Sequence, residues 1–242
     1  ATKSSPEYKG TRTLGAESYA PGKLAFDTTY FWRVDEVNNV NPDSPWTGNV
    51  WSFGTGAFLV VDDFESYNDI DPPDPASSRI FDKWIDGFGT LTNGALVGND
   101  LPPYAERTIA HGGVQSMPYR YDNNLKTSEA TMTLVYPRDW TEEGVTNLSL
   151  WFRGAATNAA ERMYVALNGT APVYHADPNV AQTTAWTEWV IPLQRSADQG
   201  VNLTNVTSIT IGFGTRGNTT VAGGTGQMYI DDIRLYRPAT AP

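Results

Sequence analysis

The sequence predicts an all-β chain, and three observations lead to that class. Short segments that alternate apolar and polar residues recur along the chain, whereas windows with helical spacing are short and broken by Gly, Pro or Asn. Aromatic residues, which favour strands, reach 12% and include 8 Trp and 12 Tyr. Turn residues such as Asn168-Gly169 separate the segments. Short strands at such spacing are typical of a β-sandwich or barrel.

The expected strands fall into two groups along the chain. The first two, at residues 29–35 and 49–53, are the richest in aromatic residues. Alternation predicts eight further strands, at residues 58–64, 115–121, 130–136, 147–153, 163–167, 187–192, 208–213 and 228–236. The run Gly54-Thr-Gly-Ala57 divides the groups. We therefore expect a small β segment at residues 1–56 and a larger β-sandwich at residues 57–238.

Composition limits the partners that the chain can take. The formal net charge is −10 and the pI is about 4.6, and such an acidic surface repels nucleic acids. The absence of cysteine excludes disulfides, thiol catalysis and thiolate zinc sites. No apolar run of about 18 residues is present, so we expect no membrane insertion. The chain starts at Ala1 without a signal peptide, and we expect a mature secreted protein located outside the cell or at its surface.

The small unit carries a specific pattern near its end. Tyr30, Trp32 and Val34 alternate in one strand, and after a loop Trp51 and Phe53 alternate in the next. The pattern resembles the last strands of a fibronectin type III domain, over roughly residues 11–55. That length is too short for a whole sandwich of this type, and an incomplete sandwich exposes an unpaired edge. Three explanations stay open: the front of the domain has been cut away, the segment packs on the larger unit, or a neighbouring subunit supplies the missing strands.

The larger unit opens and closes with acidic motifs. It begins with Val60-Val-Asp-Asp-Phe-Glu-Ser-Tyr67 and ends with Tyr229-Ile-Asp-Asp-Ile-Arg-Leu-Tyr236, with Gly112-Gly-Val-Gln-Ser-Met117 between them. In this order and spacing, the motifs resemble the jelly-roll (galactose-binding-like) carbohydrate-binding modules of bacterial polysaccharide-degrading enzymes. Together with the fibronectin-like segment, they also resemble large surface proteins of planctomycete-type bacteria. The resemblance implies a jelly-roll β-sandwich that binds a polysaccharide or glycan.

The same resemblance implies a structural calcium ion between the first strand, the last strand and the Gly-Gly loop. Glu65 and Asp231 would be its side-chain ligands, the loop at residues 111–113 with Gly113 would supply carbonyl oxygens, and Asp63 is a further possible ligand. Alternation places Asp231 on the face of the apolar residues two and four positions later, where a carboxylate needs a partner. Calcium prefers such oxygen ligands. The alternative is that these carboxylates are solvated strand ends.

Three segments offer aromatic and planar polar side chains that could hold a sugar. In jelly rolls of the resembled type the ligand lies on the concave sheet or in the loops at one edge. We therefore expect Tyr119, Tyr121 and Arg153 on the concave face and Trp84 on its rim. Because neighbouring residues alternate, at most one of Arg120 and Tyr121 can point into a groove. Three other tryptophans are expected in the core: Trp151, Trp186 and Trp189.

No motif indicates an enzyme. The two histidines, His111 and His175, lie in neither a His-Glu-x-x-His motif nor a Gly-x-Ser-x-Gly elbow. The Gly-rich runs at residues 212–217 and 223–226 separate strands and open no helix, so they are not phosphate loops. We expect a non-catalytic carbohydrate-binding module. The alternative is a self-assembling structural surface or filament protein, a homo-oligomer in which the N-terminal β segment pairs with a neighbouring subunit.

Overall fold

The computed structural model describes residues 7–238, and the chain divides into two compact units, Ala1–Ala57 and Phe58–Pro242. The division falls one residue from the position that the sequence predicts. Within the described part of the chain, no helix has the length and apolar character needed to cross a membrane.

The first unit is built on one antiparallel strand pair, β1 (Thr29–Trp32) and β2 (Trp51–Gly54). The register pairs Tyr30 with Phe53 and Trp32 with Trp51, so the four rings share one face. The rings stack across the strands, with centroids 5.6 Å apart in the first pair and 6.3 Å apart in the second. A two-stranded sheet covers neither of its own faces, and Trp51 is 57% exposed. The assignment of this unit to fibronectin type III stays a prediction.

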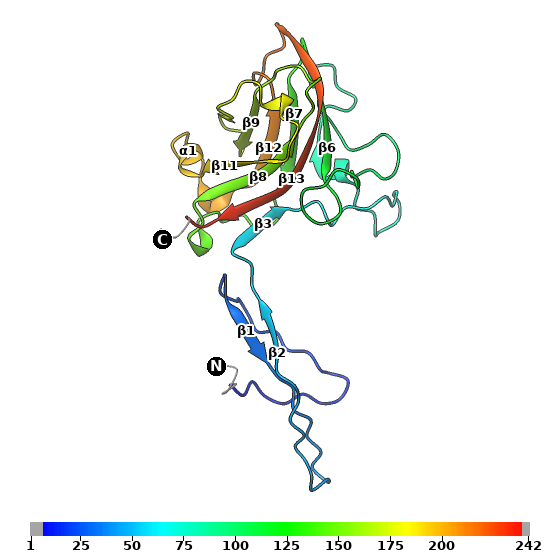
Figure 1. Cartoon of the computed structure of the whole chain (residues 1–242), viewed down its shortest axis with the longest axis vertical. Coiled ribbons are helices and arrows are strands. Elements are labelled where there is room, and N and C mark those ends of the chain that lie inside the picture. The colour runs from blue at the N-terminus through cyan, green and yellow to red at the C-terminus, as the bar shows by residue number, and fades with distance from the viewer. Residues whose placement is uncertain (1–6, 239–242) are drawn as a thin grey trace. The chain divides into compact units, whose positions relative to one another are not determined.

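The second unit is an all-β sandwich of two antiparallel sheets, as the sequence predicts (Figure 1). The five-stranded sheet has the order β10-β9-β12-β7-β4. The six-stranded sheet has the order β11-β8-β13-β6-β5, and β3 pairs with β13. The strands are β3 (Phe58–Asp62), β4 (Trp84–Ile85), β5 (Leu96–Val97), β6 (Met117–Asn124), β7 (Ser128–Thr133), β8 (Asn147–Arg153), β9 (Met163–Leu167), β10 (Val173–Tyr174), β11 (Thr187–Pro192), β12 (Ser208–Phe213) and β13 (Ala222–Tyr236).

Helical structure in the described residues is limited to short connections. The one α-helix is α1 (Gln194–Ala197), and the 3-10 turns are Ile80–Asp82, Glu142–Gly144, Val180–Gln182 and Leu203–Asn205. Four predicted strands match β8, β9, β11 and β12 residue for residue. The strands β4, β5 and β10 were not predicted, because two residues are too few to show alternation.

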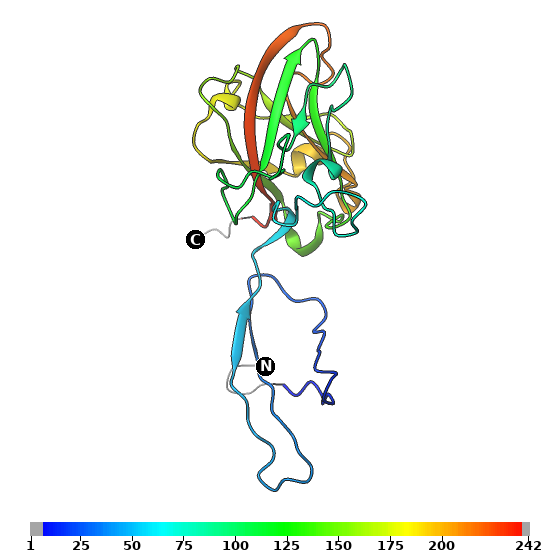
Figure 2. The same ribbon diagram turned by 90° about the vertical axis from the view of Figure 1, so that its right-hand side faces the viewer.

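The core lies between the two sheets, which face each other in Figure 2. Tyr119 of β6 packs against Phe213 of β12 with ring centroids 5.2 Å apart, and the Tyr121 ring stacks on Phe213 at 5.1 Å. The Tyr119 hydroxyl donates to the carbonyl of Ile211 at 3.2 Å, so this buried phenol is satisfied across the sheets. Large side chains from both sheets thus bury one another between the sheets.

The closing strand β13 departs from simple alternation. A register shift lies between Asp231 and Arg234, and Asp232 has a φ of +48°, the left-handed region. This β-bulge places Ile230 and Ile233 on the same inner face, both fully buried. The prediction that Asp231 shares a face with Ile233 is therefore wrong. Asp231 instead lies opposite Trp151 on the outer side of the six-stranded sheet.

Candidate functional site

The outer face of the six-stranded sheet carries the chemically richest side chains of the sandwich. On β8, Leu150 and Phe152 face the core, so Trp151 and Arg153 face outward. The register places Tyr229 of β13 opposite Arg153. Gln227 precedes Tyr229 by two residues on β13, lies on the same face and is opposite Arg120 of β6. We call this surface the β8–β13 face.

An aromatic cluster stands at one end of the β8–β13 face. The His111 ring stacks on Trp151 with centroids 3.7 Å apart and an interplanar angle of 13°. Trp186, which precedes β11, meets His111 edge-on at 5.8 Å. Both tryptophans are partly exposed, and their indole N–H groups have no partner within residues 7–238. The cluster therefore offers aromatic surface together with free hydrogen-bond donors.

Two buried carboxylates hold His111 in place. Its backbone N–H donates to Oδ2 of Asp231 at 2.8 Å, and its Nδ1 lies 2.8 Å from Oδ2 of Asp232. Burial raises the pKa of Asp231 to about 6, although N–H groups of His111 and Gly112 partly offset that effect. The bulge in β13 is what directs these successive carboxylates toward one loop.

A hollow of about 450 Å³, lined mainly by polar residues, continues the β8–β13 face. Asn158 fixes the loop that borders it, because its Nδ2 donates to the carbonyls of Ala181 and Gln227 at 2.8 Å each. Its Oδ1 accepts from the backbone N–H of Gln227 at 3.0 Å. The side-chain amide of Gln227 has no partner in the described chain and stays free for a ligand. The hollow is lined by Arg120, Tyr121, Asp122, Thr157, Asn158, Thr225, Gly226 and Gln227.

The structure separates the four residues predicted to contact sugar. Arg153 lies on the β8–β13 face, partly exposed and without an ion pair in the described chain. Tyr119 and Tyr121 alternate into the core and are 0% and 2% exposed, whereas Arg120 between them faces outward. Trp84 was expected on an exposed rim but is fully buried. Its Nε1 donates to Oδ2 of the buried Asp62 at 2.8 Å, so the indole N–H is satisfied inside the sandwich. The surface positions predicted for these three aromatic residues are therefore wrong.

The residues predicted to bind calcium come close to one another in two pairs. Strands β3 and β13 lie side by side, and the 111–115 loop reaches both ends of that pair. Oε1 of Glu65 accepts from the N–H groups of Val114 and Gln115, and Asp231 accepts from the same loop. In these contacts the loop directs N–H groups at both carboxylates. A calcium ion between them would instead need the loop to present oxygen atoms.

The remaining predicted ligands do not complete a site. Gly113 has a φ of +56°, and a Cβ at that position would lie 2.3 Å from Oε1 of Glu65. Asp63 accepts from the N–H of Glu65 at 3.2 Å. Among residues 7–238, no three His, Cys, Asp or Glu side chains are grouped to hold a metal ion. The arrangement therefore does not fit a calcium ion at this place, and calcium binding there stays a prediction.

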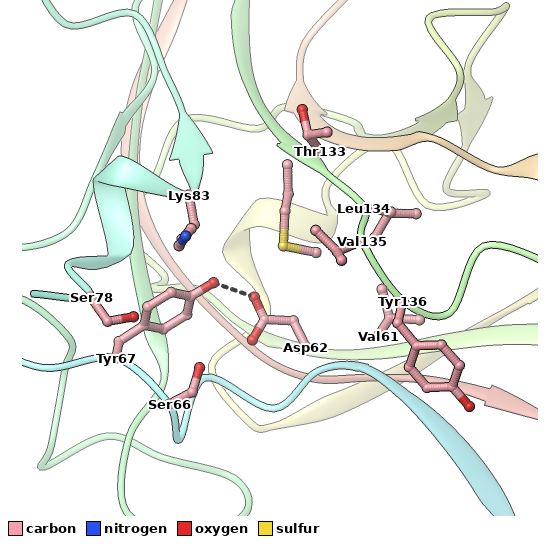
Figure 3. A pocket seen from close by; sticks show the side chains of 11 residues that line it. Val61, Asp62, Ser66, Tyr67, Ser78, Lys83, Thr133, Leu134, Val135 and Tyr136 are labelled. Atoms are coloured by element: carbon pink, nitrogen blue, oxygen red, sulfur yellow. Dashed lines mark hydrogen bonds between the residues drawn. The ribbon is translucent and has the colours of Figure 1, made fainter. Parts of the chain in front are cut away.

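A second hollow, of about 230 Å³, lies near the start of the sandwich (Figure 3). The Tyr67 hydroxyl donates to Oδ2 of Asp62 at 2.7 Å, and Oδ1 of Asp62 accepts from the N–H of Phe64. With the Trp84 contact, both carboxylate oxygens are engaged, and burial raises the pKa of Asp62. Asp62 therefore organises the interior at this end and presents no free oxygen to a ligand.

The outer face of the five-stranded sheet is more closed. Tyr164 is fully buried and lies over Gly212, where a Cβ would meet its ring at 2.2 Å. Its hydroxyl donates to Glu129 at 2.8 Å, and Arg216 pairs with the same carboxylate at 2.6 Å. These groups satisfy one another, so the β8–β13 face is the better candidate for binding.

Sequence reasoning missed four members of the site: His111, Trp151, Trp186 and Gln227. Trp151 and Trp186 were predicted in the core, but only Trp189 is buried there. The alternation of β8 could have revealed Trp151, because it is out of phase with Leu150 and Phe152. No local pattern brings His111 to Trp151, since the contact depends on the position of a loop.

Comparison with known proteins gives likenesses in structure only. No protein-family model and no curated sequence matches the chain. One similar structure is the family 11 carbohydrate-binding module from Clostridium thermocellum in complex with a β-1,3-1,4-mixed-linked tetrasaccharide; it is 15% identical, with a TM-score of 0.38, 64% of this chain covered and 95% of that chain. Another is the CBM22-1 xylan-binding domain from Paenibacillus barcinonensis Xyn10C, 14% identical, with a TM-score of 0.35 and coverage of 65% and 88%.

A third similar structure is an exo-β-agarase. It is 12% identical with a TM-score of 0.46, and the match covers 76% of this chain but 25% of the agarase. The three proteins thus include two carbohydrate-binding modules and one enzyme. All are less than 25% identical with TM-scores below 0.5, so what they bind is a property of those proteins.

Proposed function

We propose that the sandwich is a non-catalytic module that binds a polysaccharide on the β8–β13 face, outside the cell. The observation that carries this proposal is the cluster of Trp151, His111 and Trp186 with its free indole donors. Aromatic side chains with a polar handle contribute apolar contact area and a hydrogen bond at once. A sugar ring requires both, because it presents C–H groups on its faces and hydroxyls at its edge.

Planar polar groups beside the cluster would orient a bound sugar through hydrogen bonds to its hydroxyls. The Arg153 guanidinium has several donors in a fixed plane, and the Gln227 amide has both donors and an acceptor. Gln227 and Tyr229 are two residues apart on one strand, a spacing of about 6.8 Å. A chain of sugars lying along β13 would therefore meet Gln227 and the Arg153–Tyr229 pair in succession.

Native gel electrophoresis through soluble polysaccharide tests this proposal. The gels contain mixed-linkage β-glucan, xylan or agarose, and we expect at least one to retard the full chain. Arg153→Ala and Trp186→Ala should each abolish most of the retardation. Ile85→Ala is the matched control, because Ile85 is 62% exposed on the opposite sheet. Equal retardation of all variants, or no retardation of the unmodified chain by any glycan, would contradict the proposal.

A second candidate function is self-assembly through the first unit, and the ring-bearing face of β1 and β2 favours it. Phe53 and Trp32 are 43% and 48% exposed there. Adjacent exposed aromatic rings leave apolar surface in contact with water, and such patches often mark interaction sites. Residues 1–57 carry five Lys or Arg and six Asp or Glu, whereas the whole chain has a net charge of −10. Electrostatic repulsion between two copies is therefore weakest at this unit. The same face on a second copy would give a two-fold contact.

Sedimentation of the full chain over a wide concentration range tests this assembly. We expect a dimer or larger species that dissociates in the Trp32→Ala/Trp51→Ala variant. A chain that stays monomeric at the highest concentration, with its N-terminal unit intact, would remove this candidate.

A further inference from the structure

Arg153 differs from the other partly buried arginines of the chain. Among residues 7–238, six arginines are partly buried, and five of them form an ion pair with an Asp or Glu side chain. These five are Arg33, Arg79, Arg120, Arg216 and Arg234. The Arg153 guanidinium has neither an ion pair nor a hydrogen bond to any described residue. A charge that is partly removed from water needs a partner, and here the chain itself supplies none.

One carboxylate acts on the same ring as Arg153 without pairing with it. Burial and then the charge of Glu106 raise the pKa of the Tyr229 phenol, whereas the charge of Arg153 lowers it. Glu106 instead accepts from the backbone N–H of Thr108 at 2.6 Å and from the hydroxyl of the same residue. The carboxylate of Glu106 is therefore engaged by its own loop, and the Arg153 guanidinium stays available to a ligand.

The two carboxylates at the bulge of β13 are engaged as well. Asp231 accepts from N–H groups of the 111–115 loop. Asp232 pairs with Arg234 and with the histidine of that loop. The acidic groups of the β8–β13 face thus have donors of their own, and Arg153 is its uncompensated charge.

Aromatic side chains lie on both sides of Arg153. Tyr229 of β13 is directly opposite Arg153. On β11, Thr187 pairs with Phe152, and Trp186 precedes Thr187 on the side of Arg153. A sugar ring in contact with these aromatic groups would bring a substituent on its edge to the guanidinium.

We infer that the polysaccharide bound on the β8–β13 face carries acidic groups, carboxylates or sulfate esters, and that one of them pairs with Arg153. This inference rests on the proposed function, because it names the class of glycan that the same face takes. A guanidinium presents its donors in a rigid fork that matches two oxygens of one acidic group. A neutral hydroxyl also accepts a hydrogen bond, but it leaves the charge of the guanidinium uncompensated.

The net charge of −10 limits how densely the ligand can be charged. At physiological ionic strength, repulsion between the acidic protein and an acidic chain acts over about 8 Å. A chain with an acidic group on every sugar would meet that repulsion along its whole length, whereas Arg153 compensates one group. We therefore expect a sparsely acidic glycan, in which neutral sugars separate the acidic groups.

Affinity electrophoresis with matched forms of each glycan tests the inference on the full chain. Mixed-linkage β-glucan, xylan and agarose are each used in neutral form, lightly carboxymethylated and lightly sulfated. We expect an acidic form of at least one glycan to bind about tenfold more tightly than its neutral form. Comparison of the carboxymethylated and sulfated forms then identifies which acidic group the site prefers.

Variants assign the preference to Arg153. Arg153→Gln should bind the acidic and neutral forms equally, whereas Arg153→Lys keeps the charge without the fork and should keep part of the preference. Arg195→Gln is the matched control, because Arg195 of α1 is exposed, has no ion pair in the described chain, and loses the same charge. It should keep the whole preference. Circular dichroism of each variant shows whether the fold is retained.

The possible failures differ from one another. Equal binding of acidic and neutral forms by the full chain would overturn the inference and leave the proposed function in place. Equal loss of the preference in Arg195→Gln and Arg153→Gln would show a general effect of net charge and overturn the pairing with Arg153. Absence of retardation by every form would remove the proposed function itself, and this inference with it.

Discussion

Both units pair aromatic rings, but the first unit pairs them within one exposed sheet and the sandwich pairs them between two sheets. In the first unit, Tyr30 stacks on Phe53 and Trp32 on Trp51, and the rings stay substantially exposed. In the sandwich, the rings of Tyr119 and Phe213 come from two different sheets, lie 5.2 Å apart with a tilt of 59°, and are both fully buried. A second sheet is therefore what converts a row of rings from a surface into a core.

The largest expected change in the free energy of unfolding comes from removing a buried ring in the sandwich. Trp84→Ala should lower the free energy of unfolding of the sandwich by about 3–5 kcal/mol, because it leaves a cavity and removes a donor from Asp62. Trp51→Ala, on the exposed side, should change it by less than about 0.5 kcal/mol. Denaturant unfolding followed by circular dichroism measures both.

Trp84→Phe separates the cavity from the lost hydrogen bond. It keeps an aromatic ring but removes the indole N–H, and we expect a cost of about 1–3 kcal/mol. If Trp51→Ala destabilised the sandwich as strongly as Trp84→Ala, the exposed rings of the first unit would contribute as much to stability as the buried rings of the sandwich, which contradicts this prediction.

The second expected effect is a pH dependence that belongs to the sandwich alone. Burial raises the pKa of Asp231 from 3.8 to about 6. A raised pKa in the folded state means that the stabilising contribution is complete below pH 3.8 and is lost as the pH rises through 6. Asp231→Asn should remove this dependence and gain roughly 1–3 kcal/mol at pH 7.

Unfolding in EDTA between about pH 2.8 and about pH 7, about one unit beyond each pKa, is the measurement. Asp69→Asn is a suitable control, because Asp69 is a partly exposed carboxylate that pairs with Arg107. An unchanged pH profile in Asp231→Asn would mean that the pKa of Asp231 is the same in the folded and the unfolded chain, and it would contradict this prediction.

The sequence predicts the strands and the β-sandwich because both depend on local alternation. The pattern of β8 predicts its bounds residue for residue. What fails is the direction of particular side chains. The sequence predicted Trp84 on a rim and Trp186 in the core, yet Trp84 is buried and donates to a carboxylate, whereas Trp186 is partly exposed and meets a histidine from a distant loop. The direction of Ile233 depends on a bulge at Asp232, and one extra residue reverses the alternation after it.

The third effect distinguishes two tryptophans at nearly the same place in the chain. Trp189 of β11 is 7% exposed, whereas Trp186 just before the strand is partly exposed. Trp186→Ala should weaken polysaccharide binding about tenfold, equivalent to about 1.4 kcal/mol, with little change in stability. Trp189→Ala should mainly destabilise the fold. Affinity electrophoresis and denaturant unfolding of both variants give the comparison, and equal loss of binding in two folded variants would remove the special role of Trp186.

The smallest effect concerns the exposed rings themselves. A cross-strand aromatic pair in a sheet contributes about 0.2–1 kcal/mol, so the coupling between Tyr30 and Phe53 should fall in that range. A double-mutant cycle with Tyr30→Ala and Phe53→Ala, read by hydrogen exchange of the β1 and β2 amides in the full chain, measures it. Because a strand pair alone is marginally stable, these amides should exchange far faster than those of β8 and β12. Protection that rises with protein concentration would instead show that a second copy covers the rings, and the exposed face would then be half of a core.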